Sequence, residues 1–511
     1  MTPADDRSRE DAADNTLTAR RLGIDTRREA VIFMRRDCHV CRSEGLAAHA
    51  RVRVANGKRA IIATLYHVTT ELLPPGEAGL SEAAWESLGV AGGGAITVSH
   101  ARPLASMSTV RARIYGNRLS EDEMHLVIGD IVAGRYSDID LSAFITACAA
   151  LPLNEAETVA LTRAMVDAGD RLQWPTAPVV DKHCVGGLPG NRTTPIVVAI
   201  VTACGLTMPK TSSRAITSPA GTADTMETLA PVALDIAQMR RVVEREGGCI
   251  VWGGAVRLSP ADDILIGVER ALDIDSEGQL VASVLSKKIA AGSTHLVLDM
   301  PVGPTAKVRS AESAEILAKT LSSVGKAFGI ETRVLQTDGT QPVGHSIGPA
   351  LEARDVLSVL RGEAGAPEDL RDRAVHLAGA LLELAGHAPD GTGATEAAET
   401  LADGHAWAKF QAICEAQGGM RTPPQASHRM PVLAPANGTV TTIDNRKIAR
   451  VAKFAGAPDA KAAGIRLHFR LGDRVEEGQP LYTIHAESPG ELAYALGYAA
   501  ANADIVSVTE P

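Results

Sequence analysis

Hydrophobic and polar positions change their spacing several times along this chain, and each spacing predicts a different kind of structure. Residues 30–34 and 60–68 are rich in Val, Ile and aromatic side chains, as strands are. The pair Asn56–Gly57 lies between them and is typical of a hairpin turn. We therefore expect a β-rich N-terminal domain over residues 16–100. The polar, acidic segment before it, residues 1–15, is expected to be disordered.

Residues 104–172 show apolar positions at helical spacing, for example Leu126, Val127 and Ile131. Polar pairs three positions apart stand where three of these helices are expected to begin. They are Ser120 with Glu123, Ser137 with Asp140, and Asn154 with Glu157, the first of them a full capping box. This stretch is expected to be an all-helical domain.

Residues 175–425 alternate between strand and helix patterns, which predicts a mostly parallel sheet covered by helices. Ligands of such sheets bind at the carboxyl ends of the strands. From residue 430 to 511 the pattern is β-rich again, and Asn437–Gly438 with residues 439–443 is interpreted as a hairpin. The fold class is therefore α/β multidomain, with a helical lobe, a mixed α/β lobe, and small β-rich domains at both ends.

The composition excludes several classes of function. A chain of 511 residues with 45 % hydrophobic and 22 % charged residues is typical of a globular protein with two to four domains. A net charge of −10 argues against a nucleic-acid-binding face. No apolar run reaches the roughly 18 residues of a membrane span, and the N-terminal segment lacks a signal-like hydrophobic centre, so we expect a cytoplasmic protein without a membrane partner.

Seven cysteines, an odd number, indicate reduced thiols rather than a disulfide framework. Cys38 and Cys41 form a Cys-x-x-Cys pair, which is half of a zinc site in other proteins. No second pair follows at ligand spacing, so we interpret this spacing as incidental and expect no metal.

The strongest candidate for a binding site is residues 181–195, a glycine-rich turn expected between a buried strand and a helix. The apolar run that follows has Thr194 as the expected cap, Pro195 at the first helical position and Gly205 just past the end. Free N–H groups at a helix N-terminus favour an anion, and Lys182 adds a positive charge. The turn is therefore expected to bind phosphate, although a purely structural turn stays open on the glycines alone.

Two familiar phosphate motifs are absent from this turn, because no Gly-Lys-Ser/Thr closes it and the Gly-x-Gly-x-x-Gly spacing is missing. A second donor-rich loop, residues 210–222, precedes a helix expected at 223–229. Two such loops at one edge of a parallel sheet can surround one small anion.

These two loops resemble those of the thymidine phosphorylase and AMP phosphorylase family. The resemblance continues through 251–254, 259–263, 283–288 and 341–345 and covers roughly residues 105–511. The longer N-terminal part is similar to the archaeal AMP phosphorylases and to the long-form bacterial proteins assigned as thymidine phosphorylases. The resemblance implies a nucleoside phosphorylase/phosphoribosyltransferase-like fold in which a segment near 258–290 returns to the helical lobe.

The resemblance also implies residue roles. Phosphate-binding positions fall on Lys182, Cys184, Gly187, Thr193, Ser212 and Thr222. Cys184 departs from the serine of many relatives, and because a thiol donates weakly, the affinity for phosphate is expected to change. A reactive nucleophile is the alternative interpretation of a cysteine beside Lys182 and His183. Phosphorolysis needs no such nucleophile, because phosphate itself attacks the sugar.

At the nucleoside end, catalytic roles fall on His183, Arg270, Lys287 and Asp275, the last as a proton donor to a purine or else a plain loop residue. Nucleoside-binding positions fall on Ser213, Arg214, Ala215, Ile216, Thr217, Ser218, Ser283 and Lys307. Ser283 and Lys287 share a helix face, which would otherwise be a solvated charged stripe. Arg192, Arg214 and Lys307 are the spare cations that the 5′-phosphate of AMP would need.

The resemblance therefore predicts a pentosyltransferase that cleaves thymidine with inorganic phosphate as co-substrate and with no cofactor. AMP phosphorolysis is the first alternative. A magnesium-dependent phosphoribosyltransferase is the second, with Asp224 or the pair Asp262–Asp263 as metal ligands, and a non-catalytic nucleotide sensor is the third. Otherwise Asp262 and Asp263 are ordinary acidic residues of a helix start. The family forms dimers through the helical lobe, and some members form larger assemblies.

Overall fold

The computed structural model describes residues 15–215, 218–274 and 276–509. The chain divides into two compact units, Met1–Leu153 with Ile264–Ser276, and Asn154–Asp263 with Glu277–Pro511. Each unit has its own hydrophobic core. Of the segment 1–15, for which we predict disorder, only Asn15 belongs to the described part, and its Nδ2 donates to Glu44 Oε1 at 2.8 Å. No helix in the described ranges is long and apolar enough to span a membrane.

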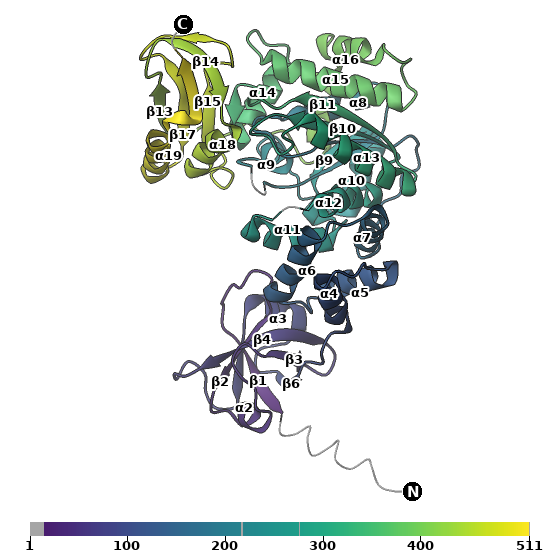
Figure 1. Cartoon of the computed structure of the whole chain (residues 1–511), viewed down its shortest axis with the longest axis vertical. Coiled ribbons are helices and arrows are strands. Elements are labelled where there is room, and N and C mark those ends of the chain that lie inside the picture. Colours follow the sequence, from purple (N-terminus) through teal and green to yellow (C-terminus); the bar gives the residue numbers. More distant parts are fainter. Residues whose placement is uncertain (1–14, 216–217, 275, 510–511) are drawn as a thin grey trace. The chain divides into compact units, whose positions relative to one another are not determined.

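The N-terminal strands close into a barrel (Figure 1). In their order around it they are β1 (Thr16–Arg21), β5 (Glu77–Leu80), β2 (Val31–Arg35), β4 (Ala60–Val68), β3 (Arg51–Ala55) and β6 (Ala95–His100). Alternate side chains fill the interior, and Val52, Val54 and Leu65 are buried. The predicted hairpin at Asn56 is confirmed, because β3 and β4 pair antiparallel and Asn56 Oδ1 accepts the N–H of Arg59 at 2.8 Å.

Three helices follow the barrel in the first unit: α4 (Ala105–Ile114), α5 (Glu121–Val132) and α6 (Asp138–Ala150). The next helix, α7 (Glu155–Asp167), opens the second unit. The starts of α5, α6 and α7 are the three predicted ones, and all three are reciprocal capping boxes. In each, the capping side chain and the residue three positions on satisfy one another's backbone N–H groups.

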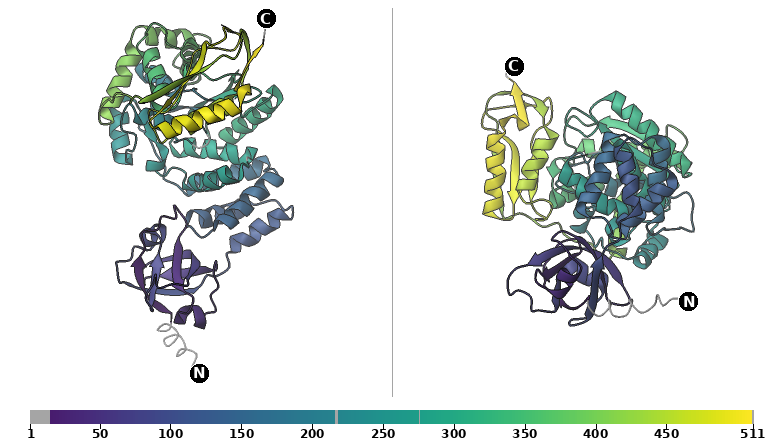
Figure 2. Two further views of the ribbon diagram at one scale, coloured as in Figure 1. Left: turned by 90° about the vertical axis from the view of Figure 1, so that its left-hand side faces the viewer. Right: turned by 60° about the horizontal axis from the view of Figure 1, so that its bottom comes forward.

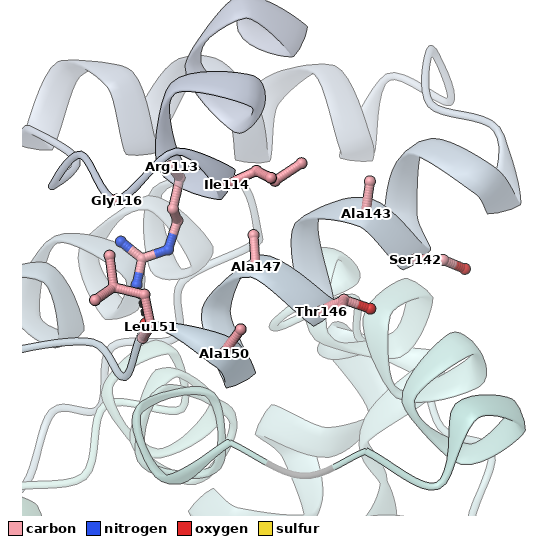
Figure 3. A pocket seen from close by; sticks show the side chains of 9 residues that line it. All are labelled: Arg113, Ile114, Gly116, Ser142, Ala143, Thr146, Ala147, Ala150 and Leu151. Atoms are coloured by element: carbon pink, nitrogen blue, oxygen red, sulfur yellow. Dashed lines mark hydrogen bonds between the residues drawn. The ribbon is translucent and has the colours of Figure 1, made fainter.

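A pocket of about 430 Å³ lies beside α4 and α6 in the first unit (Figure 3). Its wall is formed largely by small side chains of α6, among them Ala143, Ala147 and Ala150. The buried Arg113 also lines the pocket and donates from Nη2 to the carbonyl oxygen of Leu151 at 2.5 Å. None of the predicted site residues lines this pocket.

The strands of the main sheet in the second unit pair in parallel. The strand β10 (His295–Val302) lies between β7 (Val180–Cys184) and β11 (Glu331–Asp338), and β8 (Met208–Ser212) pairs with β9 (Gly248–Trp252). A parallel bridge between Val179 and Thr207 joins the two groups just before β7 and β8 begin. The carboxyl ends of β7, β8 and β10 therefore lie at the same edge.

Helices cover both faces of this sheet, as predicted (Figure 1). On β10, Val297 packs into the core formed with α8 (Thr193–Ala203) and α15 (Glu368–Leu384), whereas Leu296 and Leu298 pack into the core formed with α12 (Glu277–Ala290) and α13 (Ala311–Ala327). The residues of α8 from Thr193 to Thr202 are all buried. This helix is therefore a central element of the core rather than a surface layer.

The last part of the chain holds two small sheets with two helices, seen at the left of Figure 1 and in Figure 2. The sheets are ordered β12 (Ser346–Ile347), β15 (Gly464–Leu467), β17 (Pro480–Ala486), β13 (His428–Leu433), and β16 (Arg474–Val475), β14 (Gly438–Ile443), β18 (Val506–Thr509). The helices are α18 (Asn445–Phe454) and α19 (Pro489–Ala501). The predicted hairpin at Asn437–Gly438 is wrong, since β13 and β14 belong to different sheets.

Candidate active site

Strand β7 presents two chemically different faces, because successive side chains of a strand point to opposite sides. Asp181 and His183 belong to one face, and Lys182 and Cys184 to the other. Asp181 and Lys182 are buried, although both are charged residue types. Such side chains are rarely buried unless they are paired, so each face needs its own set of partners.

Lys182 lies among oxygen atoms on its face. Its Nζ donates to Thr193 Oγ1 at 2.6 Å and lies 3.9 Å from Asp299 Oδ2, which comes from the adjacent strand β10. Asn191 Nδ2 donates to the same Asp299 oxygen at 2.8 Å, and Thr337 Oγ1 donates to the other at 2.6 Å. Burial lowers the pKa of Lys182, and Asp299 opposes that effect. The ammonium group is thus held where the glycine turn begins.

Cys184 is a poor nucleophile in this environment. Burial, with the nearby Asp299 carboxylate as the second cause, raises the pKa of its thiol to about 12. Asn191 Nδ2 donates to Cys184 Sγ at 3.1 Å. Because the thiolate is the reactive form of cysteine, this arrangement disfavours the interpretation of Cys184 as a covalent nucleophile.

The other face of β7 carries a buried charge cluster that the sequence patterns did not predict. Asp181 Oδ1 lies 3.0 Å from Lys210 Nζ on β8, and Oδ2 lies 2.7 Å from Lys288 Nζ on α12. Burial alone would raise the pKa of Asp181, but the two ammonium groups outweigh it and the pKa is lowered. For His183, burial and then Lys288 and Lys210 lower the pKa well below its usual value, so its imidazole is neutral.

The glycine turn after β7 is tightly packed against other loops. A Cβ on Gly190 would lie 2.0 Å from the carbonyl oxygen of Val343, and Gly190 has a positive φ of 71°. A Cβ on Gly187 would lie 3.8 Å from Ser218 Cβ, so the two predicted loops do meet. Helix α8 begins at Thr193 with Arg192 as its N-cap, which corrects the predicted cap at Thr194. Gly205 follows its end with φ of 90°.

The second loop contributes a buried hydroxyl. Ser212, at the carboxyl end of β8, has an Oγ that is buried and has no hydrogen-bond partner among the described residues. Its neighbours hold the loop instead: Asp224 Oδ2 accepts the backbone N–H groups of Ala215 at 2.7 Å and Gly221 at 3.0 Å. Ser218 Oγ is used locally and donates to the carbonyl oxygen of Ala220. Ser213 is exposed. Ile216 and Thr217 lie outside the described residues.

Arg192 and Arg214 were predicted to be spare cations, but both are paired, which corrects that expectation. Arg192 donates to Glu352 Oε2 at 2.7 Å, to Thr222 Oγ1 and to the Ala220 carbonyl oxygen, both at 2.9 Å. Arg214 forms ion pairs with Glu227 at 2.7 Å and Asp224 at 3.2 Å. Both arginines therefore fix the shape of the two loops.

Lys307 is exposed, and a Cβ on Gly186 would lie 2.6 Å from the Cβ of Lys307. Its side chain thus starts directly beside the glycine turn.

Asp224 accepts from two backbone N–H groups and also lies 3.4 Å from Lys461 Nζ. Its oxygens are occupied, so it is not a good magnesium ligand.

Ser283 and Lys287 lie on α12, as predicted. Lys287 Nζ is 2.5 Å from Oδ2 of the buried Asp262, in the first turn of α11 (Pro260–Leu272). This contact gives Asp262 a role as the partner of Lys287 and argues against a magnesium-binding acidic pair. Arg270 is exposed and belongs to the first unit, so its role stays a prediction. Asp275 lies outside the described residues.

The sequence matches three family descriptions that follow one another along the chain. Residues 108–169 match the helical bundle domain of the glycosyl transferase family, and residues 176–407 match its a/b domain. Residues 439–506 match the pyrimidine nucleoside phosphorylase C-terminal domain.

The chain matches near relatives over almost their whole length. A protein from Polaromonas sp. is 63 % identical over 494 residues, covering 97 % of both chains, and one from Sphingopyxis alaskensis is 62 % identical over 502 residues, covering 98 % of both. Each bears the name "Putative thymidine phosphorylase". The chain belongs to the thymidine phosphorylase family. It is a pentosyltransferase of the glycosyl transferase family.

A solved structure supports the fold of this phosphorylase-family chain. Anthranilate phosphoribosyltransferase from Thermus thermophilus is similar with a TM-score of 0.51 and 22 % identity, and the match covers 60 % of this chain and 98 % of that one. The shared fold consists of the helical bundle and the α/β domain, as the sequence predicted.

Within the phosphorylase-family fold, the structure brings together Lys182 and Thr193 directly, and the loops of Gly187 and Ser218 by close approach. The sequence patterns missed the groups that support them: Asp181 with Lys210 and Lys288, Asn191 with Asp299, and Glu352 with Arg192. A strand with two successive charged residues, Asp181 and Lys182, was the available signal, because both faces of a buried strand must then hold counter-charges.

Proposed function

We propose that this protein catalyses the phosphorolysis of thymidine: inorganic phosphate attacks the anomeric carbon of the deoxyribose, and thymine leaves. The products are thymine and 2-deoxy-α-D-ribose 1-phosphate. The observation that carries the proposal is the phosphate end of the site. Buried Lys182 is hydrogen-bonded to Thr193 at the first residue of α8, beside a second loop whose buried Ser212 hydroxyl has no partner among the described residues.

This arrangement suits an anion that acts as a nucleophile. Phosphate brings its own negative charge, so the protein has to position it and neutralise part of that charge. Lys182 supplies the charge, the first turn of α8 supplies N–H groups, and Ser212 supplies a hydroxyl without a partner in the described part of the chain. Phosphate is then a co-substrate, and no cofactor is required. A thiol with a raised pKa at Cys184 fits a mechanism without a covalent intermediate.

The base end needs donors for the negative charge that develops on the leaving pyrimidine. Lys287, oriented by Asp262, and neutral His183 are suited to that task, because an ammonium group and an imidazole N–H both donate. Ser283 lies one helical turn before Lys287 on the same face of α12. The family resemblance adds Arg270 as a further donor, and that role stays a prediction.

The state of the loop cations favours thymidine over AMP. AMP carries a 5′-phosphate, which requires its own cationic partners, and Arg192 and Arg214 are held by Glu352 and Glu227. Thymidine has no such charge and needs neither arginine. One observation favours AMP as the alternative substrate: Lys307 starts beside Gly186 with an exposed side chain.

We also propose a cytoplasmic homodimer or larger homo-oligomer. None of the seven cysteines forms a disulfide bond in the described ranges, which supports a reducing compartment. Large apolar side chains are exposed on the helices of the first unit and the turn after α4, with Ile139 82 % and Tyr115 86 % exposed, and a second copy would cover them.

The test is phosphate-dependent release of free base from thymidine and from AMP, with one enzyme sample and no added metal. Release of thymine with little adenine supports the proposal. Release of adenine from AMP moves the protein to nucleotide cleavage and gives Lys307 a role. If phosphate releases neither base, but diphosphate with magnesium takes the phosphoribosyl group of AMP and releases adenine, the phosphoribosyltransferase alternative replaces the proposal.

A further inference from the structure

Three side chains with metal-binding atoms meet away from the nucleoside site, at the far end of helix α8. Cys204 is the C-cap of α8, His387 follows the end of α15, and Glu396 lies in the first turn of α16 (Gly393–Ala402). One ligand atom from each, the thiol sulfur, a ring nitrogen and a carboxylate oxygen, all lie within 4.8 Å of one another. Nothing in the phosphorolysis chemistry uses these residues.

The local geometry already holds two of the three donors together. His387 Nε2 lies 2.8 Å from Glu396 Oε1, and the backbone N–H of His387 donates to the Leu382 carbonyl oxygen at 2.9 Å, which fixes the loop. Zinc bonds of about 2.0–2.3 Å place tetrahedral ligand atoms about 3.3–3.8 Å apart. Side-chain rotations that move the ligand atoms by about an ångström therefore bring Cys204, His387 and Glu396 to the distances that such an ion requires.

The charges around Cys204 favour a cation. A carboxylate oxygen of Glu396 lies within 4.8 Å of the thiol sulfur, and the carboxylate of Asp403 is a second negative charge near it. A thiol flanked by two carboxylates is a poor place for an additional negative charge but a good place for a divalent cation, whose binding displaces the thiol proton. Thr400 Oγ1 lies 3.4 Å from Cys204 Sγ and can donate to the thiolate.

We propose that Cys204, His387 and Glu396 form a Zn²⁺-binding site, with water as the fourth ligand. One thiolate, one imidazole and one carboxylate are the donor types that zinc takes in proteins. The bound ion ties the C-terminal end of α8 to α15 and α16. The same helix carries Thr193 at its other end, so the ion stabilises the helix on which the phosphate loop is built.

A simpler interpretation is a surface ion pair between His387 and Glu396 with a cysteine that lies near it by chance. The two interpretations differ in the part played by Cys204. In an ion pair the sulfur is a bystander, whereas in a zinc site it is a ligand and its loss removes most of the affinity.

The test is titration of the full-length protein with Co²⁺, which takes zinc sites and reports a thiolate ligand through an intense near-ultraviolet charge-transfer absorption. We expect one equivalent to give this absorption in the wild type, Zn²⁺ to remove it by displacement, and Cys204→Ser to abolish it. His387→Gln and Glu396→Gln should each weaken Co²⁺ binding by roughly tenfold or more, as loss of one ligand or its support does. The double variant Cys38→Ser/Cys41→Ser is the matched control and should leave the absorption unchanged.

A second readout separates metal binding from a folding defect. Zn²⁺ should raise the thermal unfolding midpoint of the wild type and of the Cys38/Cys41 double variant, but not that of Cys204→Ser, whose circular dichroism spectrum should match the wild type. The proposal is overturned if wild type shows no thiolate absorption, or if the absorption survives Cys204→Ser and disappears in the Cys38/Cys41 variant. Neither outcome depends on phosphorolysis.

Discussion

Arg192 Nε donates to Glu352 Oε2 at 2.7 Å, and the two residues stand 160 positions apart in the sequence. Arg192 precedes α8, and Glu352 lies in the first turn of α14 (Pro349–Leu360). The other guanidinium nitrogens bind Thr222 and the Ala220 carbonyl oxygen of the second loop. One buried ion pair therefore joins both phosphate loops to a third element of the α/β domain.

Glu352→Gln should destabilise the protein and weaken phosphate binding. The substitution keeps the shape of the side chain but leaves the guanidinium of Arg192 buried without its counter-charge. Breaking a buried pair in this way costs about 3–5 kcal/mol. We expect that loss in the unfolding free energy from urea titration, and a higher KM for phosphate because Arg192 no longer holds Thr222.

Glu363→Gln is the matched control, because Glu363 forms a solvent-exposed pair with Arg361 at 3.3 Å, with side chains 48 % and 41 % exposed. Exposed pairs contribute about 0–1 kcal/mol. Equal effects of the two substitutions would contradict the view that the Arg192–Glu352 pair organises the loops.

Lys182→Met should abolish most phosphorolysis while the fold survives. Loss of one preorganised donor to a reacting anion costs roughly 100- to 1,000-fold in kcat. Asp299 keeps its bonds from Asn191 and Thr337, so its carboxylate is not left bare. Steady-state rates against phosphate concentration measure the effect. The control is Lys447→Met, whose ammonium pairs with Asp504 at the surface, and it should behave as wild type. A fully active Lys182→Met would remove the phosphate loop from the proposal.

How far the sequence determines this site depends on the range of the interaction. Local signals were sufficient for the three capping boxes and for the β3–β4 hairpin, because all the groups involved lie within a few residues. The strand–turn–helix at Lys182 was also predictable, since its apolar run and its glycines are contiguous in the sequence.

Long-range pairing was not predictable from the same patterns. Arg192 and Arg214 looked unpaired in the sequence, because nothing near Arg192 reveals Glu352 and a pattern of spacing does not reveal which acid each arginine meets. The turn at Asn437 has the residues of a hairpin, yet the strand after it, β14, pairs with β18, which begins at Val506. Tertiary packing decided both outcomes.

Cys184 should resist alkylation and should tolerate substitution by serine. With the pKa of the thiol raised to about 12, the thiolate fraction at pH 8 is only about 10⁻⁴. Mass spectrometry of the Cys184 peptide after iodoacetamide treatment should show slow labelling relative to glutathione in the same sample. Cys184→Ser should keep most of the activity, since serine can accept the hydrogen bond from Asn191. A loss of roughly 10⁶-fold, as for removal of a nucleophile, would reinstate covalent catalysis.

His183 should make the fold less stable in mild acid. Burial and the surrounding lysines lower the pKa of the folded imidazole well below its usual value, whereas in the unfolded chain it is about 6.5. Below about pH 6.5 the unfolded state therefore binds a proton that the folded state refuses, and the unfolding free energy falls by up to about 1.4 kcal/mol per pH unit until the folded pKa is reached. Above about pH 6.5 the imidazole is neutral in both states, so the stability that is lost in acid is fully present.

Urea unfolding between about pH 5 and pH 8 tests the sign of that effect. His183→Gln cannot take up the proton, so its stability relative to wild type should rise as the pH falls. His376→Gln, at an exposed position of α15, is the control for the removal of a histidine elsewhere in the domain. A His183 variant whose difference from wild type is constant over this range would show that the imidazole is not held neutral.

Asp262 should act through Lys287 rather than through a metal. The carboxylate lies 2.5 Å from Lys287 Nζ and is buried, so Asp262→Asn releases the ammonium group from its orientation. Loss of such a charged contact costs about 1–3 kcal/mol, which predicts a roughly 5- to 150-fold fall in kcat/KM for the nucleoside. The KM for phosphate should change little, because phosphate is bound by the loops of Lys182 and Ser212.

A double-mutant cycle with Lys287→Met measures the coupling between Asp262 and Lys287. If both residues act as one unit, the double variant is no worse than Lys287→Met alone. Two results together would instead assign Asp262 to a metal. The losses of activity in the two single variants would be additive, and the wild type would require added magnesium for an activity that Asp262→Asn lacks.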